Sequence, residues 1–196
     1  PHKSVFDLDY VGVKASQFSF SRLAKADPVL GVDMASTGEV GCIGDSFHEA
    51  LLKAMYSVGY RMPVKAVLIS SGPAKAKADL LEAVRLLEKL GYEIFATRGT
   101  QQFLSNAGVA AKVAYWPDEQ ASPNTVELIR KRVVDLVINI PKDLSATELS
   151  NDYQIRRSAV DYNIPLITNA RLASAFINAF CSVPESEIEI KAWDEY

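Results

Sequence analysis

The chain has 196 residues, of which 48% are hydrophobic and 23% are charged, enough for one full domain and a smaller additional piece. Its 21 Lys and Arg residues are outnumbered by 24 Asp and Glu and form no runs, which argues against a nucleic-acid-binding protein. No apolar run approaches the ~18 to 20 residues that cross a bilayer, which argues against a membrane protein.

The N-terminal third lacks a regular alternation of strands and helices. Residues 9–15 ("DYVGVKA") and the apolar parts of 31–44 predict antiparallel strands around Thr37-Gly38. A helix is expected next, because Ser46 and Glu49 have the spacing of a capping box. The N-terminus has neither the basic start nor the apolar middle of a signal peptide, and we expect a chain cut from a longer protein.

From Lys65 onward, apolar runs alternate with amphipathic stretches. The five runs are residues 65–71, 93–98, 110–115, 133–140 and 165–169. In the first amphipathic stretch, Leu80, Val84 and Leu87 recur at helical spacing, and Gly91 is expected to end the helix. The predicted fold class is therefore α/β, a doubly wound five-stranded parallel sheet preceded by a small α+β piece.

Pro63 in "RMPVK" marks the boundary between these two parts, because proline stops a helix and the composition changes around it. We expect one unit over 1–62, a second over 63–183 and an acidic tail over 184–196. The tail is either a loose end or packs through Trp193 and Tyr196.

Polar side chains gather at the predicted carboxyl ends of the strands, where an open parallel sheet binds its ligands. The candidates are Lys75 and Lys77 after Ser70-Ser71-Gly72, then Thr97, Thr100, Trp116, Asn139, Lys142 and Thr168. Backbone N–H groups of the helix expected after Thr100 would stabilise a phosphate or carboxylate, with ~0.3–1 kcal/mol from the helix dipole. Each residue also has a structural interpretation, such as a helix cap for Thr100 or a solvated charge for Lys75.

Catalytic patterns are scarce. His48 lies early in a predicted helix, and neither a Ser/His/Asp set nor a carboxylate pair is present. "SSGPAKAK" is neither GxxxxGK[ST] nor GxGxxG, so ATP chemistry is not expected from this segment. Cys42 and Cys181 are isolated, which argues against a metal or redox site and favours a reducing compartment.

Two long segments resemble the carbamoyl-phosphate synthase large chain. "QFSFSRLAKADPVLGVDMASTGEVGCIG" and "EALLKAMYSVGY" resemble the end of its second ATP-grasp domain. "FATRGT", "LVINIP" and "YQIRRSAVDYNIPLITNARLASAF" resemble the methylglyoxal-synthase-like allosteric domain that follows there. The resemblance covers nearly the whole chain and has its junction at "RMP".

The resemblance implies a ligase that makes carbamoyl phosphate from bicarbonate, two ATP, and ammonia or glutamine-derived ammonia, for arginine, urea or pyrimidine synthesis. ATP and Mg or Mn would bind elsewhere in the full-length enzyme, and this piece needs no cofactor. A glutaminase subunit or domain and a homo-oligomer are the implied partners. The cytoplasm is the expected compartment, with the mitochondrial matrix as the alternative.

The family also implies roles for single residues. Thr97 and Thr100 match the paired threonines that hold an effector anion, and Asn139 matches the binding Asn of "VIN". Trp116 resembles the ammonia-dependent, acetylglutamate-activated type, whereas the nucleotide-regulated bacterial type has lysine. This favours N-acetylglutamate over UMP or IMP as the effector.

Other positions depart from that type. Lys142 and Asp152 stand where it has Asn, and a buried Asp152 would repel an anion unless Lys142 offsets it. Ala15 replaces a carboxylate of the ornithine-responsive enzymes, and Thr168 is the contact retained from their C-terminal set.

Two other functions remain open. Methylglyoxal synthase shares the threonines and a similar "NIPLITNA" segment, but its Gly-Gly-Asp loop and histidine are missing, and we expect Asp118 to be the only nearby carboxylate. A non-binding interaction module is the third possibility.

Overall fold

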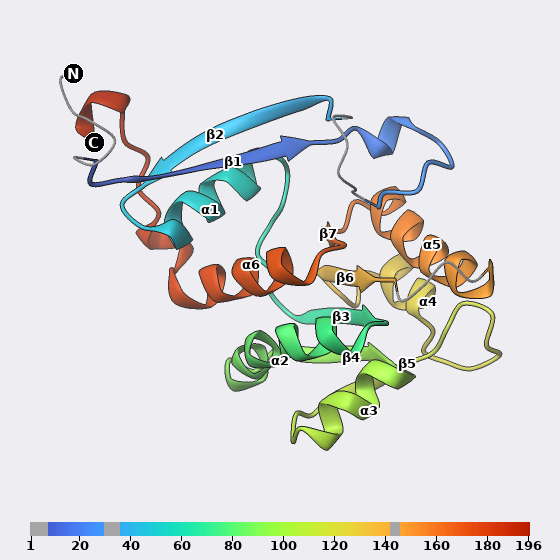
Figure 1. Ribbon diagram of the computed structural model, residues 1–196. Helices are drawn as coiled ribbons and strands as arrows, with labels where there is room; N and C mark the ends of the chain where they lie inside the picture. Colours follow the sequence, from blue (N-terminus) through green and yellow to red (C-terminus); the bar gives the residue numbers. More distant parts are fainter. Residues whose placement is uncertain (1–7, 30–35, 142–145) are drawn as a thin grey trace.

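Two sheets organise the chain in this computed structural model, which describes residues 8–29, 36–141 and 146–196 (Figure 1). The small antiparallel sheet comprises β1 (Val11–Gln17) and β2 (Gly38–Gly44), and α1 (Phe47–Ser57) follows it. The larger sheet comprises β3 (Ala66–Ser71), β4 (Glu93–Thr97), β5 (Lys112–Ala114), β6 (Leu136–Ile140) and β7 (Leu166–Ile167). Its helices are α2 (Ala74–Lys89), α3 (Arg98–Asn106), α4 (Thr125–Arg130), α5 (Ala146–Asp161) and α6 (Ala170–Ser182).

The larger sheet has the strand order β5-β4-β3-β6-β7, and each neighbouring pair is parallel. The predicted fold class is confirmed. The chain runs outward from β3 to β4 and β5, then returns to place β6 on the other side of β3. The connections after β3 and β6 therefore diverge, which is the point where an open α/β sheet has its ligand crevice.

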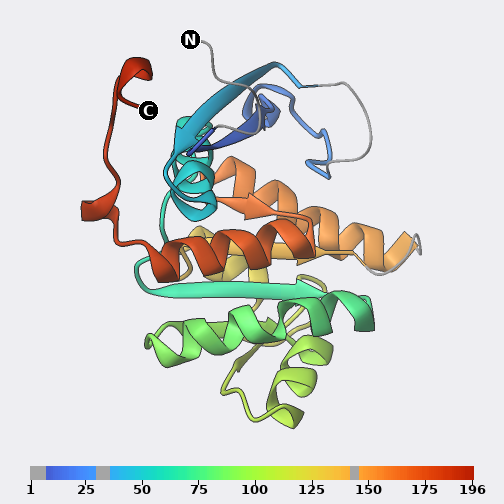
Figure 2. The same cartoon turned by 60° about the vertical axis from the view of Figure 1, so that its left-hand side comes forward.

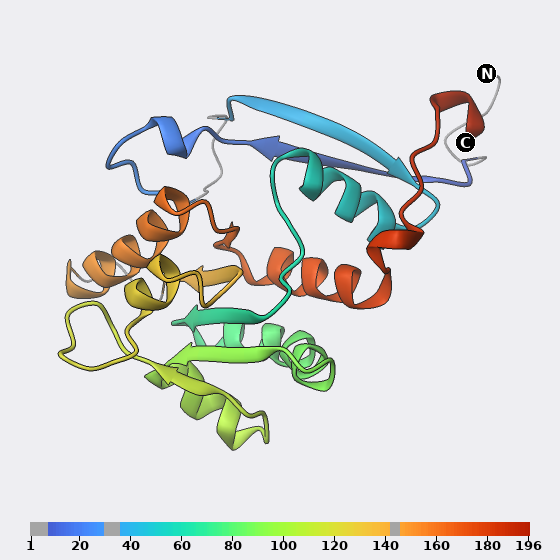
Figure 3. The same cartoon turned by 180° about the vertical axis from the view of Figure 1, so that it is seen from behind.

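Both faces of this sheet are covered, which explains why its strands are continuous apolar runs. In β3, Val67 and Ile69 belong to one core cluster with α2 and α6, whereas Ala66 and Leu68 belong to the other with α4 and α5. In agreement, α2 lies in front of β3 and β4 in Figure 1 and behind them in Figure 3. Successive side chains of a strand point to opposite faces. The clusters of these core residues therefore show to which face each remaining side chain of β3 points.

The small sheet and the large one are joined through helices. Figure 2 shows α6 between β3 and α1, and the small sheet lies beyond α1. Leu52 and Met55 of α1 share a core cluster with Phe176 of α6. The helix α1 begins as its capping motif predicts, since Ser46 Oγ accepts from Glu49 N at 3.2 Å. Glu49 reaches back to the backbone N of Asp45 at 2.8 Å.

Two details differ from the sequence-based expectation, and one lies outside the described residues. The helix α3 begins at Arg98, so Thr100 lies inside its first turn and not before it. Thr37 and Gly38 form no hairpin turn, because Gly38 opens β2 and pairs with Gln17 at the end of β1. The predicted strand residues 31–35 lie outside the described residues. No helix in the described ranges has the length and apolar character needed to cross a membrane.

The junction around Pro63 is an irregular segment tied to the large sheet. One carboxylate oxygen of Asp135 accepts from the backbone N of Val64, Lys65 and Ala66, at 3.2, 2.6 and 3.3 Å. Tyr60 Oη donates to Leu166 O at 2.6 Å. The linker is thereby held at both its ends.

The C-terminal tail also makes contacts. Tyr196 Oη donates to Ile43 O at 3.0 Å and accepts from Lys53 Nζ at 2.9 Å. The ring of Tyr196 lies 5.9 Å from that of Tyr10. The tail therefore packs on the small sheet and α1 through Tyr196, while the side chain of Trp193 is outside the described residues.

Gly91 ends α2 in a left-handed conformation with φ of 82°. Its N–H donates to Glu88 O at 2.9 Å, and Tyr92 N donates to Leu87 O at 3.0 Å, the hydrogen-bond pair of a Schellman motif. We expect Gly91→Ala to lower the free energy of unfolding by ~1–2 kcal/mol, because an L-residue is disfavoured in this conformation. Urea unfolding measures it. Gly41→Ala is the control, since a Cβ there meets nothing within 4 Å. An equal loss in both variants would contradict the prediction.

Candidate functional site

Polar side chains form a row across three neighbouring strands at the carboxyl edge of the sheet. Ser70 lies two residues beyond Leu68 in β3 and so faces α4 and α5. Asn139 of β6 is in register with Ser70, and Thr97 of β4 lies on Ser70's other side. Thr97 and Asn139 are 3% and 0% exposed, so both belong to the interior. The structure therefore brings together the predicted Thr97 and Asn139.

The two threonines have different roles at this edge. Thr97 Oγ1 donates to Ser70 Oγ at 3.2 Å and lies 3.5 Å from Thr100 Oγ1. Thr100 Oγ1 accepts from Ser71 N at 3.0 Å and donates to Ser71 O at 3.1 Å. Thr97 is the N-cap residue of α3, but its hydroxyl makes no capping hydrogen bond. Ser71 Oγ is buried and has no hydrogen-bond partner within the described part of the chain.

Thr100 connects α3 to β3, and we expect Thr100→Val to lower the free energy of unfolding by ~1–3 kcal/mol. The substitution keeps the shape of the side chain but leaves the buried N–H of Ser71 without an acceptor. Urea unfolding would measure the change. Thr37→Val removes an exposed hydroxyl that also bonds to backbone, and should cost far less. A loss no larger than that of this control would show that the Thr100 bond is unimportant.

Lys77 and Lys75 lie at different places in the structure. Lys77 Nζ lies 3.9 Å from the point where a Cβ on Gly99 would be, and so beside the first turn of α3. Arg98 and Gly99 are exposed, so the first turn of α3 reaches the surface of the protein. Lys75 instead lines a separate cavity of about 470 Å³ with His48 and Arg171. Only Lys77 of the two predicted lysines lies near the threonines.

Trp116 follows β5 at the same edge. Ala114, two residues before Trp116, is in register with Thr97, and the half-buried Trp116 side chain packs on the core cluster of α4 and α5. Glu119 fixes the loop that follows, since it accepts from Trp116 N at 2.8 Å and from Arg98 Nη2 at 2.9 Å. Trp116 therefore borders the row formed by Thr97, Ser70 and Asn139.

A network of charges continues the row beyond Asn139. Asn139 Nδ2 donates to Asp152 Oδ1 at 2.7 Å, and Asn139 Oδ1 accepts from Arg156 Nη1 at 2.7 Å. The other edge of the Arg156 guanidinium pairs with both oxygens of Asp27, at 2.7 and 2.6 Å. Burial raises the pKa of Asp152, although the Asn139 hydrogen bond and Arg156 oppose the effect.

Sequence reasoning missed Arg156 and Asp27. The available signal was the four-residue spacing of Asp152 and Arg156, which puts both on one face of a helix. The expectation that Asp118 is the only nearby carboxylate is wrong, because Asp152 touches Asn139 directly. Asp118 instead accepts a hydrogen bond from Asn151 Nδ2 at 2.9 Å.

The buried carboxylate of Asp152 should make stability depend on pH. Its folded-state pKa lies above the ordinary value of 3.8, so the folded protein binds this proton more tightly than the unfolded chain does. The stability gained from the proton is present below pH 3.8 and is lost as the pH rises through the folded-state pKa. We therefore expect Asp152→Asn to be more stable than wild type at pH 7, with a gain that shrinks toward pH 3. Denaturation across this range measures it. A gain that grows on acidification would contradict the assignment.

Two predicted residues lie outside this arrangement. Thr168 is half-buried and lines a cavity of about 450 Å³ between β7, the end of α1 and residues 16–22. Lys142 lies outside the described residues. The structure thus separates Thr168 from the row and leaves the position of Lys142 a prediction.

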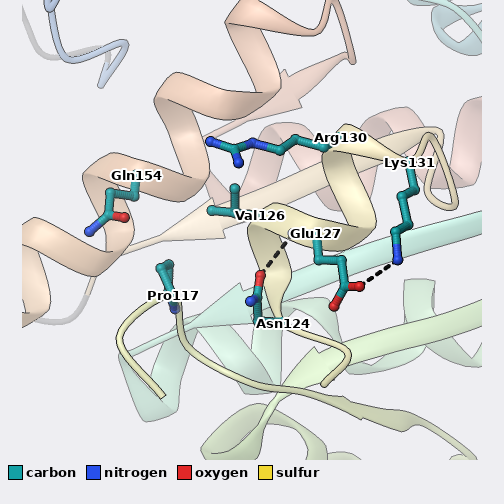
Figure 4. A pocket seen from close by; sticks show the side chains of 7 residues that line it. All are labelled: Pro117, Asn124, Val126, Glu127, Arg130, Lys131 and Gln154. Carbon is teal, nitrogen blue, oxygen red and sulfur yellow. Dashed lines mark hydrogen bonds and ion pairs between the residues drawn. The ribbon is translucent and has the colours of Figure 1, made fainter. Parts of the chain in front are cut away.

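A further cavity of about 470 Å³ lies between the loop after β5, α4 and α5. Figure 4 shows that Arg130 extends along this cavity toward Gln154, while Glu127 pairs with Lys131 at 2.5 Å. Asn124 is engaged as the N-cap, accepting from Glu127 N at 2.8 Å. The cavity shares no lining residue with the row of Thr97, Ser70 and Asn139.

Within residues 8–29, 36–141 and 146–196, no cluster of three or more His, Cys, Asp and Glu could hold a metal ion. Burial raises the pKa of Cys181 to about 11, which keeps this thiol protonated at neutral pH.

Comparison with known proteins shows which family this chain resembles. Residues 79–168 match the family model of the MGS-like domain, which includes Thr97, Thr100 and Asn139. The chain is 48% identical over 181 residues to multifunctional protein ura1 of Schizosaccharomyces pombe, covering 88% of this chain and 8% of the relative. It is 43% identical over 183 residues to multifunctional protein CAD of Squalus acanthias, covering 86% and 8%. It is 38% identical over 179 residues to the human mitochondrial carbamoyl-phosphate synthase [ammonia], covering 89% and 12%.

By fold and by family model, the chain contains an MGS-like domain. More particularly, it belongs with the carbamoyl-phosphate synthases and related multifunctional proteins and matches their MGS-like region, so the resemblance is confirmed. The chain spans about a tenth of the length of these relatives.

Proposed function

We propose that this chain is the effector-binding regulatory region of a carbamoyl-phosphate synthase and that it binds a small anion at the start of α3. The first turn of α3 carries this proposal. The side chain of its N-cap Thr97 makes no capping hydrogen bond, Arg98 and Gly99 are exposed, and Lys77 lies beside Gly99. A helix N-terminus with an adjacent ammonium favours a phosphate or carboxylate.

The buried hydroxyls supply the second half of the site. Ser71 Oγ has no partner among the described residues, Thr100 Oγ1 bonds to the backbone of Ser71, and Thr97 Oγ1 lies 3.5 Å from Thr100 Oγ1. These hydroxyls can hydrogen-bond to a ligand that reaches past the first turn of α3. Because they are nearly fully buried, we infer that the loop held by Glu119 moves when the ligand enters.

The charges beside Asn139, at the end of the row away from α3, favour a ligand whose second end carries no negative charge. Asp27, Arg156 and Asp152 together carry one excess negative charge, located beside Asn139. A second carboxylate placed there would be repelled, whereas a hydroxyl or N–H donor would be accepted. The sequence favours N-acetylglutamate through Trp116, but these charges lead us to propose instead a nucleoside monophosphate such as UMP or IMP, with Trp116 next to the base.

In the complete protein, we propose that this region regulates the synthesis of carbamoyl phosphate from bicarbonate, ATP and ammonia or glutamine, for arginine, urea or pyrimidine synthesis. ATP and Mg or Mn would bind to other parts of that enzyme. A glutaminase subunit or domain and a homo-oligomer are proposed partners. The proposed compartment is the cytoplasm, with the mitochondrial matrix as alternative. The units 1–62, 63–183 and 184–196 remain the proposed domain division.

Calorimetric titration with UMP, IMP, N-acetylglutamate and ornithine, each alone, tests the binding. We expect saturable binding of UMP or IMP, weakened ~10-fold or more by Lys77→Ala, because a charge-assisted hydrogen bond contributes ~1.5–3 kcal/mol. Lys75→Ala is the matched control, since it removes the same charge from the same helix at a different cavity. Equal effects of the two variants would mean that the anion does not bind at α3.

Asp152→Asn identifies the end of the ligand that lies beside Asn139. This variant should weaken the binding of a ligand that donates a hydrogen bond there. It should strengthen the binding of a ligand that presents a carboxylate. Binding of N-acetylglutamate alone, strengthened in this variant, would reverse our choice of ligand. If none of the four compounds binds, the alternative that remains is a non-binding interaction module. Release of methylglyoxal from dihydroxyacetone phosphate would show that the protein is a methylglyoxal synthase-like lyase.

A further inference from the structure

The helix α5 contacts the proposed effector site and the N-terminal unit at the same time. Asp152 and Arg156 hold the side-chain amide of Asn139. Arg156 and the next residue, Arg157, hold the segment 20–27 that connects β1 to β2. The contacts on both sides belong to side chains within two turns of one helix.

The segment 20–27 is bound mainly through its backbone. Arg157 Nη1 donates to the carbonyls of Phe20 and Leu23 at 3.1 and 2.9 Å, and Tyr153 Oη donates to Lys25 O at 3.1 Å. Asp27 supplies the one charged contact between the segment and Arg156. Withdrawal of this segment from α5 would therefore remove the carboxylate from Arg156.

Arg156 has no exposed surface and lies within the electrostatic reach of two carboxylates. Asp27 occupies the Nε and Nη2 edge of the guanidinium, which leaves Nη1 for Asn139. If Asp27 is lost, that edge becomes a buried and unpaired cation, which is strongly unfavourable. The remaining carboxylate is Asp152, and pairing with it would break the hydrogen bonds that orient Asn139.

We propose that Asp27 is a positioning residue for the effector site. Its ion pair with Arg156 prevents Arg156 from pairing with Asp152, and this fixes the orientation of the Asn139 amide for the ligand. This inference rests on the function proposed above. Its consequence is that ligand binding at Asn139 and docking of segment 20–27 on α5 favour each other. The coupling is reciprocal, so each event strengthens the other by the same factor.

The test compares Asp27→Asn with Asp161→Asn in the complete 196-residue chain. Both variants remove a carboxylate paired with one of the two adjacent arginines of α5, but Asp161 pairs with Arg157, which has no bond to Asn139. Asp27→Glu keeps the charge and is the conservative variant. Asp27 is 39% exposed, and dispersed amide spectra would confirm that each variant folds.

The first measurement needs no ligand. The side-chain amide signals of Asn139 in ¹⁵N NMR should shift, and their hydrogen exchange should accelerate, in Asp27→Asn but not in Asp161→Asn. Asp27→Glu should restore the slow exchange. Unchanged Asn139 signals in Asp27→Asn would overturn the positioning role, whatever the protein binds.

The second measurement uses UMP as the probe. Asp27→Asn should weaken UMP binding about fivefold or more, the usual lower range of coupling between sites, while Asp161→Asn stays near wild type. In wild type, UMP should slow backbone hydrogen exchange in residues 20–27. Wild-type UMP binding that Asp27→Asn leaves intact would overturn the coupling. If wild type binds no UMP while the Asn139 signals still respond to Asp27, the positioning role stands and the proposed function fails.

Discussion

A guanidinium without access to water must be neutralised inside the protein, and this requirement determines how the two parts of the chain meet. Arg156 is such a group, with Asp27 on one edge and Asn139 on the other. Breaking a buried ion pair from one side is far more costly than losing a surface pair, because the remaining charge stays buried. The segment around Asp27 contains little regular structure of its own, so its position depends on the hydrogen bonds and the ion pair that it makes with α5.

The alternation of side chains along the strands brings the proposed site to the same helix. Ser70, Thr97 and Asn139 all point to the face that α4 and α5 cover, because each follows a core residue of that face by two positions. The proposed anion-binding features lie at the opposite end of the row, at α3. A ligand that extends from α3 to Asn139 therefore touches groups from both faces of the sheet, and its two ends meet opposite electrostatic environments.

Much of the fold could be predicted from the sequence, since parallel strands buried on both faces give apolar runs that are hard to miss. The antiparallel pair of β1 and β2 could be predicted as well, but its register could not, because Gln17 and Gly38 pair although they lie 21 positions apart in the sequence. At the site, Thr97, Asn139 and Lys77 could be placed because strand ends share one edge. Lys75 could not be separated from Lys77 until the direction of α2 was known, since residues two apart on a helix face different ways. The Asp27–Arg156 pair joins residues 129 apart and has no local signature.

The three amides that converge on Asp135 limit how the two units can move. Bending at residues 64–66 would break the hydrogen bonds that one oxygen of Asp135 accepts from three backbone N–H groups. This stretch is therefore held rigidly at the start of β3. Any relative movement of the two units therefore has to be taken up where α1 packs on α6, through an apolar contact whose attraction is not directional and so does not fix one position.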